Sequence, residues 1–451
     1  MLGYESETSD SQLAALLARY SRTRLPVRVD FRKLVAHIRS VDRATHLIHP
    51  YPAKLLVQIP FFLLSNSILS KAGDRVLDPF AGSGTVPLEA MLAGRIPLAA
   101  DANPIARVIT EAKTTPLNPR NLEAALKRTL VRTQKTARSP LPDVVNINYW
   151  FTRKTIRRLQ CLKESICKIR DVDQRRFFLI AFSACVRKVS LADPRLSVPV
   201  RLRSDQYIKG HPFYEKTQNL LVHLQDCDVN EIFERVALAN LRRMQLLWDA
   251  IQSPPQLKTY NDARNLASPG SRVEDSSVQL VITSPPYPGA QKYVRSTSLS
   301  LGWLGLATQT DLRSLKQQSI GREEFNKYRT EQLAKTGIKH ADTLITKIAH
   351  VDRTRAAVVS TYLIEMKDAL EEIYRVLKPG GYAAIIASAG CIARRRFPTP
   401  DFLVQIAKSL GFHLMLHLSD TIKSRGLMTK RNRTASVIGT EAVLIFRKAA
   451  P

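Results

Sequence analysis

Cysteine is scarce in this sequence, and its five cysteines form no pattern that marks a site. No two of them stand in a C-x-x-C pair and none has a histidine at metal-ligand spacing; they are Cys161, Cys167, Cys185, Cys227 and Cys391. This spacing indicates neither a disulfide framework nor a zinc centre. We expect small core residues in a reducing compartment, and no metal cofactor.

Long apolar runs are missing as well. The N-terminal residues lack a basic segment followed by an apolar stretch, and the longest apolar runs elsewhere are too short to cross a bilayer. We therefore expect a cytoplasmic protein with no membrane partner.

Acidic residues are few relative to basic ones. The chain has 68 Lys and Arg against 39 Asp and Glu, which gives a formal net charge of +29. The basic residues recur in short groups, at 153–158, 187–188, 201–203, 394–396 and 430–433. A charged surface that only keeps the protein in solution is one explanation, but so large an excess of one sign favours a polyanionic partner, and nucleic acid in particular.

What the sequence does contain is the opening of a doubly wound sheet. Residues 75–80 and 96–100 have the pattern of short buried strands, and a helix with Pro87 in its first turn lies between them. Further strand patterns follow at 278–287, 382–390 and 442–448. The predicted fold class is therefore α/β, a doubly wound Rossmann-like sheet built from both sides of a large helical insertion.

The 451 residues divide into regions of different composition. We predict an N-terminal extension (1–45), a catalytic domain in two pieces (46–118 and 256–451), a basic helical insertion between them (119–255), and a recognition or lid segment within the second piece (291–351). In the extension, Leu13, Leu16 and Leu17 can form one side of an amphipathic helix. The recognition segment is polar, basic and weakly periodic, as mobile or substrate-reading segments often are.

A glycine-rich turn follows the first predicted strand, in the sequence Asp78-Pro-Phe-Ala-Gly-Ser-Gly-Thr85. Its glycines allow a ligand to approach the backbone, and the free N–H groups of the next helix face that ligand. Pro87 takes the place of the third glycine of a dinucleotide motif and no Lys-Ser/Thr follows, so NAD and ATP are poor candidates. Asp78 suits the ammonium group of a methionine moiety, and Asp101, after the second strand, can accept from both ribose hydroxyls. A helix N-cap before Asn103 is the alternative for Asp101.

A second motif, Thr283-Ser-Pro-Pro-Tyr287, follows the strand pattern that begins at Val278. Its two prolines fix the backbone, so the Ser284 hydroxyl and the Pro285 carbonyl can both accept hydrogens from an amino group. Tyr287 offers a ring on which an unstacked base can lie. Both motifs are expected at the carboxyl edge of the sheet, where ligands bind in this architecture.

Together the two motifs resemble the cofactor and catalytic motifs of amino-methylating DNA methyltransferases, a family of the class I superfamily that uses S-adenosylmethionine. Residues 46–54 (HLIHPYPAK) are similar to the family's N-terminal motif, which closes over the methionine end of the cofactor, and residues 261–264 (NDAR) to the turn that contacts its adenine. The resemblance covers about residues 46–112 and 256–447.

The resemblance implies a set of site residues. The cofactor site would consist of His49, Tyr51, Pro52, Asp78, Pro79, Phe80, Gly82, Gly84, Thr85, Asp101, Asn103, Asp262, Ala263 and Thr283, and the catalytic set of Ser284, Pro285, Pro286 and Tyr287. Taken singly, His49 and Tyr51 are more often packing residues, and Asp262 is more often a turn former.

The activity that the resemblance implies is site-specific methylation of double-stranded DNA at an exocyclic amino group, with the target base flipped out of the helix. Ser284 before Pro-Pro-Tyr resembles the N4-cytosine pattern, whereas enzymes acting on adenine N6 usually carry Asp or Asn there. No cysteine follows a proline, so methylation of cytosine C5 is not expected. Two alternatives stay open: an adenine-N6 DNA or RNA amino-methyltransferase, and a catalytically silent nucleic-acid-binding module with the same fold. A restriction-modification or defence role in a prokaryotic cell or phage, with a cognate restriction endonuclease as partner, follows from the same resemblance.

Overall fold

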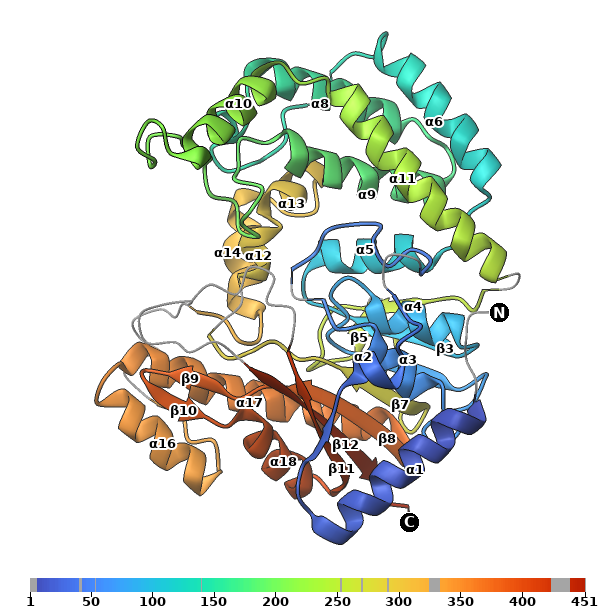
Figure 1. Cartoon of the computed structure of the whole chain (residues 1–451), viewed down its shortest axis with the longest axis vertical. Coiled ribbons are helices and arrows are strands. Elements are labelled where there is room, and N and C mark those ends of the chain that lie inside the picture. Colours follow the sequence, from blue (N-terminus) through green and yellow to red (C-terminus); the bar gives the residue numbers. More distant parts are fainter. Residues whose placement is uncertain are drawn as a thin grey trace.

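The computed structural model describes residues 6–39, 43–52, 54–138, 140–251, 254–268, 271–289, 292–323, 333–422 and 439–450. Its centre is an eight-stranded sheet with the strand order β1-β11-β12-β8-β7-β2-β3-β4 (Figure 1). The strands are β1 (Val27–Val29), β2 (Arg75–Asp78), β3 (Ile96–Ala100), β4 (Lys258–Tyr260), β7 (Val278–Thr283), β8 (Leu377–Ala387), β11 (Phe412–Thr421) and β12 (Thr440–Lys448).

The sheet is parallel except at β12, which runs antiparallel to both of its neighbours. From β2 the chain builds outward to β3 and β4 on one side, and later to β7 and β8 on the other. The strand order therefore reverses between β2 and β7, and ligands bind outside the carboxyl ends of the strands at such a reversal. The predicted doubly wound α/β fold is confirmed.

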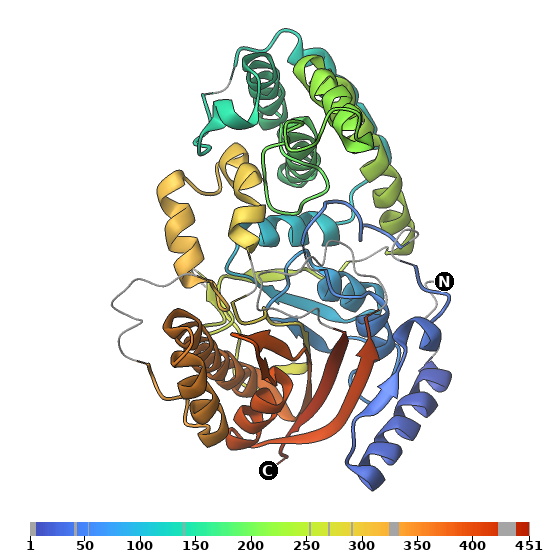
Figure 2. The same ribbon diagram turned by 60° about the vertical axis from the view of Figure 1, so that its left-hand side comes forward.

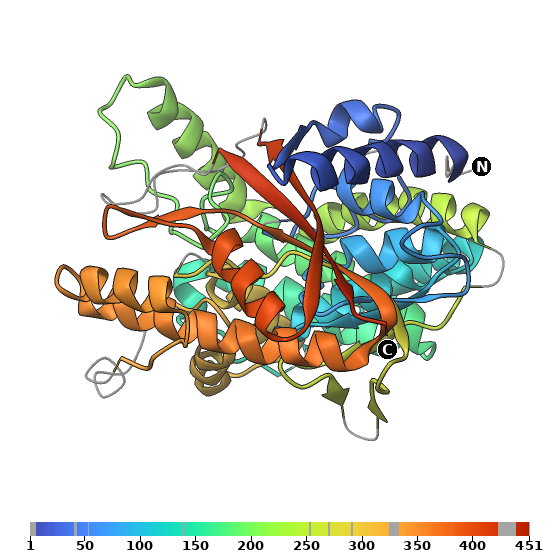
Figure 3. The ribbon, with the colours of Figure 1, turned by 90° about the horizontal axis from the view of Figure 1, so that it is seen from below.

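Helices cover both faces of the sheet because successive residues of its inner strands point to opposite sides. Ala384 and Ile386 of β8 pack against one set of helices and Ala383 and Ile385 against another. The first set is α1 (Ser6–Thr23), α2 (Phe31–Leu34), α3 (Gln58–Leu64) and α4 (Thr85–Leu92); the second is α16 (Lys339–Ala349), α17 (Arg353–Val376) and α18 (Thr399–Ser409). Figure 3 shows α1 on one side of the sheet and α17 and α18 on the other.

The residues between β3 and β4 form a series of helices joined by loops. Their helices are α5 (Pro104–Thr114), α6 (Pro119–Thr133), α7 (Ile147–Trp150), α8 (Arg153–Cys167), α9 (Val172–Val189), α10 (Pro212–Asp226) and α11 (Val229–Ala250). Four of these helices begin at a residue whose side-chain oxygen accepts from the first N–H groups of the helix, which fixes where the helix begins. These N-caps are Asn118 for α6, Thr152 for α8, Asp171 for α9 and Asp228 for α11. Figures 1 and 2 both show α6 to α11 beyond α5, on the side away from the sheet.

Part of the segment predicted as a recognition element joins this helical group. It contains α12 (Tyr293–Ser296), α13 (Ser298–Leu304) and α14 (Gln309–Gln318). Trp303 of α13 is fully buried and makes edge contacts with the rings of Phe151 and Phe182. The start of the segment is thus anchored in the same core as α9. Two short hairpins, β5 (Ala267–Ser268) with β6 (Ser271–Arg272) and β9 (Gly390–Ile392) with β10 (Arg395–Phe397), complete the elements.

The sequence suggested that residues 1–45 form an extension before the catalytic domain. In the structure, part of this segment belongs to the central sheet. The predicted amphipathic helix is present as α1, with Leu13 fully buried. However, β1 pairs in parallel with β11, with Val27 opposite Leu418, and forms the edge of the sheet. The reason is that the apolar residues of this segment cover strand edges and a face that would otherwise be exposed to water.

The cysteines are all free thiols, but they are not all core residues as expected. Cys185 and Cys227 are buried, whereas Cys167, at the last turn of α8, is exposed. Among the described residues, no helix is long and apolar enough to cross a membrane.

Candidate active site

A cavity opens at the carboxyl ends of β2, β3, β4 and β7, where the strand order reverses. About 870 Å³ of space that no atom fills lies between its walls, a figure that includes open solvent at the mouth. It is lined by Tyr51, Lys54, Leu55, residues 78–83, Thr85, residues 101–103, Asp262, Ala263, Ser284, Pro286, Tyr293 and residues 318–320. Most of the predicted site residues therefore meet in one place.

The glycine-rich turn between β2 and α4 forms the floor of the cavity. Gly82 and Gly84 adopt φ values of +51° and +72°, which favour glycine. A Cβ on Gly84 would lie only 2.8 Å from Thr110 Oγ1 and 3.0 Å from Thr110 Cα, so a larger residue does not fit. Gly84 does not itself line the cavity, contrary to its predicted contact with the cofactor, because it is the N-cap of α4 and is turned against α5. Its role is to shape the turn.

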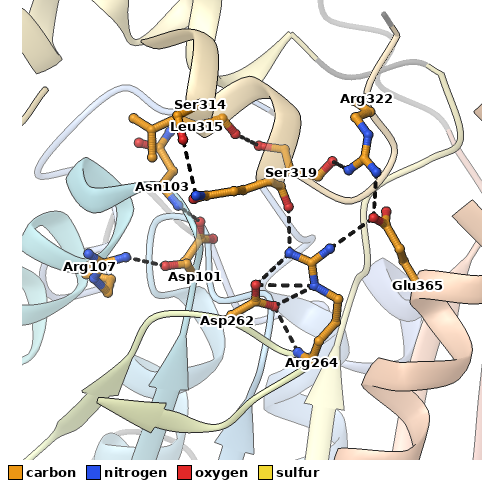
Figure 4. Close-up of polar contacts among 11 residues, drawn as sticks. Asp101, Asn103, Arg107, Asp262, Arg264, Ser314, Leu315, Ser319, Arg322 and Glu365 are labelled. Atoms are coloured by element: carbon orange, nitrogen blue, oxygen red, sulfur yellow. Dashed lines mark hydrogen bonds and ion pairs between the residues drawn. The ribbon is translucent and has the colours of Figure 1, made fainter. Parts of the chain in front are cut away.

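Asp101 ties this turn to the end of β3. Its Oδ2 accepts from the Gly82 N–H at 2.8 Å and its Oδ1 from the Asn103 N–H at 2.8 Å. Arg107 Nη1 donates to the Asp101 backbone carbonyl at 2.5 Å (Figure 4). Burial raises the pKa of the Asp101 carboxyl, although the two backbone N–H groups oppose the rise. Asp101 therefore forms a turn and also faces the cavity, and the N-cap of α5 is Asn103.

Asp78 lies at the end of β2 with only 4% of its surface exposed. Its Oδ1 accepts from the Thr283 hydroxyl at 2.6 Å and from the Phe80 N–H at 3.0 Å. Burial raises the pKa of Asp78 to about 7, because it outweighs these two hydrogen bonds and acts with the nearby charge of Asp101. The carboxyl group thus changes charge near neutral pH. Thr283 was predicted to contact the cofactor, but its side chain is turned to Asp78 and does not line the cavity.

Residues 284–287 after β7, which were predicted to be catalytic and are called the catalytic loop below, are divided between two surroundings. Ser284 and Pro286 line the cavity, whereas Pro285 and Tyr287 do not. The Tyr287 hydroxyl donates to Glu441 Oε1 at 3.0 Å and lies 3.4 Å from Ser388 Oγ, so its ring lies between the end of β8 and the start of β12. Burial raises the pKa of Glu441, although the hydrogen bond from Tyr287 opposes the rise.

The N-terminal motif contributes one side of the cavity, although not all of its predicted residues line it. Tyr51 lines the cavity and stacks on Tyr293, with ring centroids 6.3 Å apart and planes 13° from parallel. His49 and Pro52 do not line it. The His49 imidazole is buried and turned the other way, with Nε2 2.9 Å from Ser183 Oγ of α9. Burial lowers the pKa of His49 to about 3, so the ring is neutral and acts as a packing residue.

Several lining residues were not in the predicted site. Lys54 is the one Lys or Arg among the lining residues of the described chain, and its Nζ donates to the His46 and His49 carbonyls at 3.3 and 2.8 Å. Burial, together with Arg243, lowers the pKa of Lys54 to about 8. Leu55, Tyr293 and residues 318–320 were also missed. Lys54 belongs to the quoted HLIHPYPAK motif, so a signal for it existed; residues 318–320 carry no motif.

Asp262 and Ala263 line the cavity beyond the end of β4, as predicted. The Asp262 carboxylate does not stand alone, since it forms a two-pronged ion pair with Arg264, with Oδ2 2.6 Å from Nη2 (Figure 4). Its negative charge is therefore balanced within the protein.

Comparisons with known proteins agree with this geometry. No family model matches the sequence. The chain is 24% identical over 416 residues to the Type II methyltransferase M.MvaI of Kocuria varians, with 88% of each chain covered. It is 21% identical over 474 residues to the Type II methyltransferase M.BsoBI of Geobacillus stearothermophilus, with 93% of this chain and 87% of the other covered. The chain is thus similar to two Type II methyltransferases over most of its length.

Solved structures give weaker matches. A protein named as a DNA modification methylase of Thermus thermophilus, in complex with S-adenosyl-L-methionine, is 17% identical with a TM-score of 0.20, covering 40% of this chain and 50% of that one. The rRNA methyltransferase aviRa of Streptomyces viridochromogenes is 12% identical with a TM-score of 0.35, covering 93% and 96%.

The relationship to the two Type II methyltransferases extends over nearly the whole chain and confirms the recognition made from the DPFAGSG and SPPY motifs. The names of these relatives do not distinguish cytosine from adenine as the target.

Proposed function

We propose that this protein is a site-specific DNA methyltransferase that transfers a methyl group from S-adenosylmethionine to the N4 amino group of cytosine. The observation that carries the proposal is the shared cavity. The glycine turn after β2 and two residues of the catalytic loop, Ser284 and Pro286, line the same space at the carboxyl edge of the sheet. Direct transfer requires a donor and an acceptor held side by side, and this arrangement supplies a place for both.

The polar groups of the cavity fit S-adenosylmethionine. Asp78 suits its ammonium group, Lys54 its carboxylate, and Asp101 its ribose hydroxyls. When bound, this cofactor supplies an electrophilic methyl group. The remaining chemistry belongs to the chain: the Ser284 hydroxyl and the Pro285 carbonyl would accept hydrogen bonds from the target amino group, which turns its nitrogen lone pair out of conjugation with the base. The proton that the nitrogen loses on methylation would pass to solvent. No covalent intermediate with the protein is required.

The proposed partner is double-stranded DNA. The two relatives are named Type II methyltransferases, and the net charge of +29 suits a phosphate backbone. The target base must leave the helix to reach the cavity, and the Tyr287 ring beside the catalytic loop is the proposed stacking partner for the flipped base. A cognate restriction endonuclease is part of the same proposal.

The choice of base is tested by its product. Ser284 before Pro-Pro-Tyr supports cytosine N4, so DNA treated with the protein and S-adenosylmethionine is expected to yield N4-methylcytosine on nucleoside mass spectrometry. N6-methyladenine would keep the mechanism but overturn the target base. 5-Methylcytosine would contradict the mechanism itself, and label from methyl-tritiated cofactor in RNA rather than DNA would overturn the substrate.

A second prediction concerns Asp78 and pH. In the free protein the pKa of Asp78 is about 7, so at pH 6 the carboxyl is mostly neutral and cannot pair with a cationic ammonium group. Binding of that ammonium favours the ionised carboxylate, so raising the pH from 6 to 7 is expected to strengthen cofactor binding by about fivefold, with release of a proton. Calorimetry in buffers of different ionisation enthalpy measures both quantities.

Two controls accompany this measurement. Asp78→Asn removes the titrating group, and methylthioadenosine lacks the amino group, so each should give a flat dependence between pH 6 and pH 7. A slope that persists in Asp78→Asn would assign the titration to another residue.

A further inference from the structure

Residues 318–322, which we call the wall segment, touch both halves of the candidate active site. Gln318, Ser319 and Ile320 line the cofactor cavity. The next residue, Gly321, has a φ of +76°, and a Cβ built on it would lie 2.7 Å from the Tyr287 carbonyl oxygen and 3.4 Å from Pro286 Cβ. The wall segment therefore packs directly on the backbone of the catalytic loop while its other side faces the cofactor.

Two arginines donate to backbone carbonyls of the wall segment (Figure 4). One of them, Arg322, is the last residue of the segment itself. Arg264 Nη2 donates to the Gln318 carbonyl at 2.7 Å, and Arg322 Nη1 donates to the Ser319 carbonyl at 3.1 Å. Both arginines also reach the same carboxylate oxygen: Glu365 Oε1 lies 2.6 Å from Arg322 Nη2 and 3.0 Å from Arg264 Nη1. Because Glu365 belongs to the long helix α17, the wall segment is fixed to the body of the sheet.

The cluster is partly buried, so water and salt screen its ion pairs less than pairs on the open surface. The side chains of Arg264 and Asp262 are 21% and 31% exposed. The side chains of Arg322 and Glu365 are 8% and 12% exposed. Asp262, which lines the cavity beyond β4, pairs with Arg264 through both carboxylate oxygens. Arg264 thus joins the cofactor side of the cluster to the wall segment, and its charge and that of Arg322 balance the charges of Asp262 and Glu365.

We propose that the wall segment couples the cofactor cavity to the catalytic loop, with Arg264, Arg322 and Glu365 as its positioning residues. A cofactor that packs against residues 318–320 then fixes Gly321, and Gly321 sets the position of the Tyr287 backbone. This inference deepens the proposed methyltransferase function and rests on it. None of these residues transfers a proton or contacts the methyl group.

The first test is Gly321→Ala. The added Cβ has to displace the catalytic loop, because backbone atoms cannot turn away as a side chain can. We expect the single-turnover methylation rate to fall by about tenfold or more, since small displacements from productive geometry cost rate steeply, while cofactor affinity changes by less than about threefold. Gly337→Ala is the matched control, because Gly337 has a φ of +80° but no atom within 4 Å of the added Cβ. If the two variants have equal rates, Gly321 does not position the loop.

The second test is Glu365→Gln, which keeps the shape of the side chain and removes its charge. We expect cofactor affinity to fall by about tenfold, measured by calorimetry without DNA, because both arginines lose the anion that orients them. Glu371→Gln is the control, since Glu371 is half exposed on the same helix and pairs only at 3.7 Å with Lys367. Unchanged affinity in Glu365→Gln, with thermal unfolding equal to the unmodified protein, would overturn the role of the cluster.

These readouts separate the inference from the proposed function. Loss of cofactor affinity in Glu365→Gln supports the cluster even if the unmodified protein methylates no nucleic acid, which would overturn the function alone. Normal methylation by the unmodified protein and by Gly321→Ala would overturn the coupling and leave the function standing.

Discussion

Replacing Tyr287 by alanine is expected to reduce methylation by more than about a hundredfold while leaving cofactor affinity nearly unchanged. The ring does not line the cofactor cavity, so its loss removes no contact with the methyl donor. Stacking of a flipped base on an aromatic ring is worth about 1–3 kcal/mol, and a base left loose in the site also loses its in-line geometry. Single-turnover rates with DNA and calorimetry with the cofactor alone measure the two effects separately.

The control for this variant is Tyr287→Phe, which keeps the ring and loses only the hydroxyl that donates to Glu441 at 3.0 Å. The hydroxyl orients the ring and does not stack on the base, so Tyr287→Phe is expected to lose much less rate than Tyr287→Ala. A full rate for Tyr287→Ala would exclude base stacking on this ring. A large loss of cofactor affinity would instead place the ring against the methyl donor.

The elements that sequence predicted best are the buried strands of the sheet. β2, β3, β7, β8 and β12 are apolar runs bounded by turn residues, which is the pattern of strands covered on both faces. β2, β3, β7 and β8 run parallel to one another. Their predicted positions bring the residues after each strand to one edge of the sheet. The sequence therefore predicts that the glycine turn and the Ser284 loop lie together.

The missed strands are short or lie toward the edges of the sheet. β4 has three residues and begins with an exposed lysine, and β1 also has three residues. Such segments become strands because a neighbouring strand supplies the hydrogen bonds. Three residues are too few to show a periodic pattern of apolar side chains that would predict this. β11 is longer, but the three successive apolar residues Leu414, Met415 and Leu416 between His413 and His417 break the alternation that marks a half-buried strand, and the segment was not recognised.

The missed parts of the site have a different physical origin. The wall segment is recognised only through contacts between residues far apart in the sequence, such as Arg264 with the Gln318 carbonyl. Arg264 ends the quoted NDAR motif, but Gln318 belongs to no motif, and nothing in the sequence indicates that the two residues meet. His49 lies in a recognised motif, but a motif does not predict the direction in which a side chain points. In the structure the His49 side chain points toward Ser183.

Replacing Glu89 by alanine is expected to destabilise the protein by about 3–5 kcal/mol. Glu89 of α4 is fully buried, and its two carboxylate oxygens accept from Arg43 Nε at 2.6 Å and Arg43 Nη2 at 2.8 Å. His46 Nε2 also lies 2.6 Å from Glu89 Oε1. Burial alone would raise the pKa of Glu89, but the hydrogen bond from His46 and the charge of Arg43 outweigh it and hold the pKa at about 2. The carboxylate is therefore ionised at neutral pH, and its stabilisation is lost only as the pH falls below the usual range of a glutamate toward 2.

In the Glu89→Ala variant, Arg43 keeps its charge in a site where only 6% of its side chain is exposed but loses the carboxylate that faces it, which is costly in a buried environment. Urea denaturation at neutral pH measures the loss, and Glu123→Ala, which removes an exposed carboxylate paired with Lys127 on α6, should leave the midpoint unchanged. Arg43 and His46 precede Tyr51 and Lys54, which line the cofactor cavity. The Glu89→Ala variant should therefore also bind the cofactor more weakly than Glu123→Ala at temperatures where both are folded. A urea midpoint equal to that of Glu123→Ala would mean that this buried cluster contributes nothing to stability. Equal cofactor affinity in the two variants would mean that other contacts hold Tyr51 and Lys54 in place.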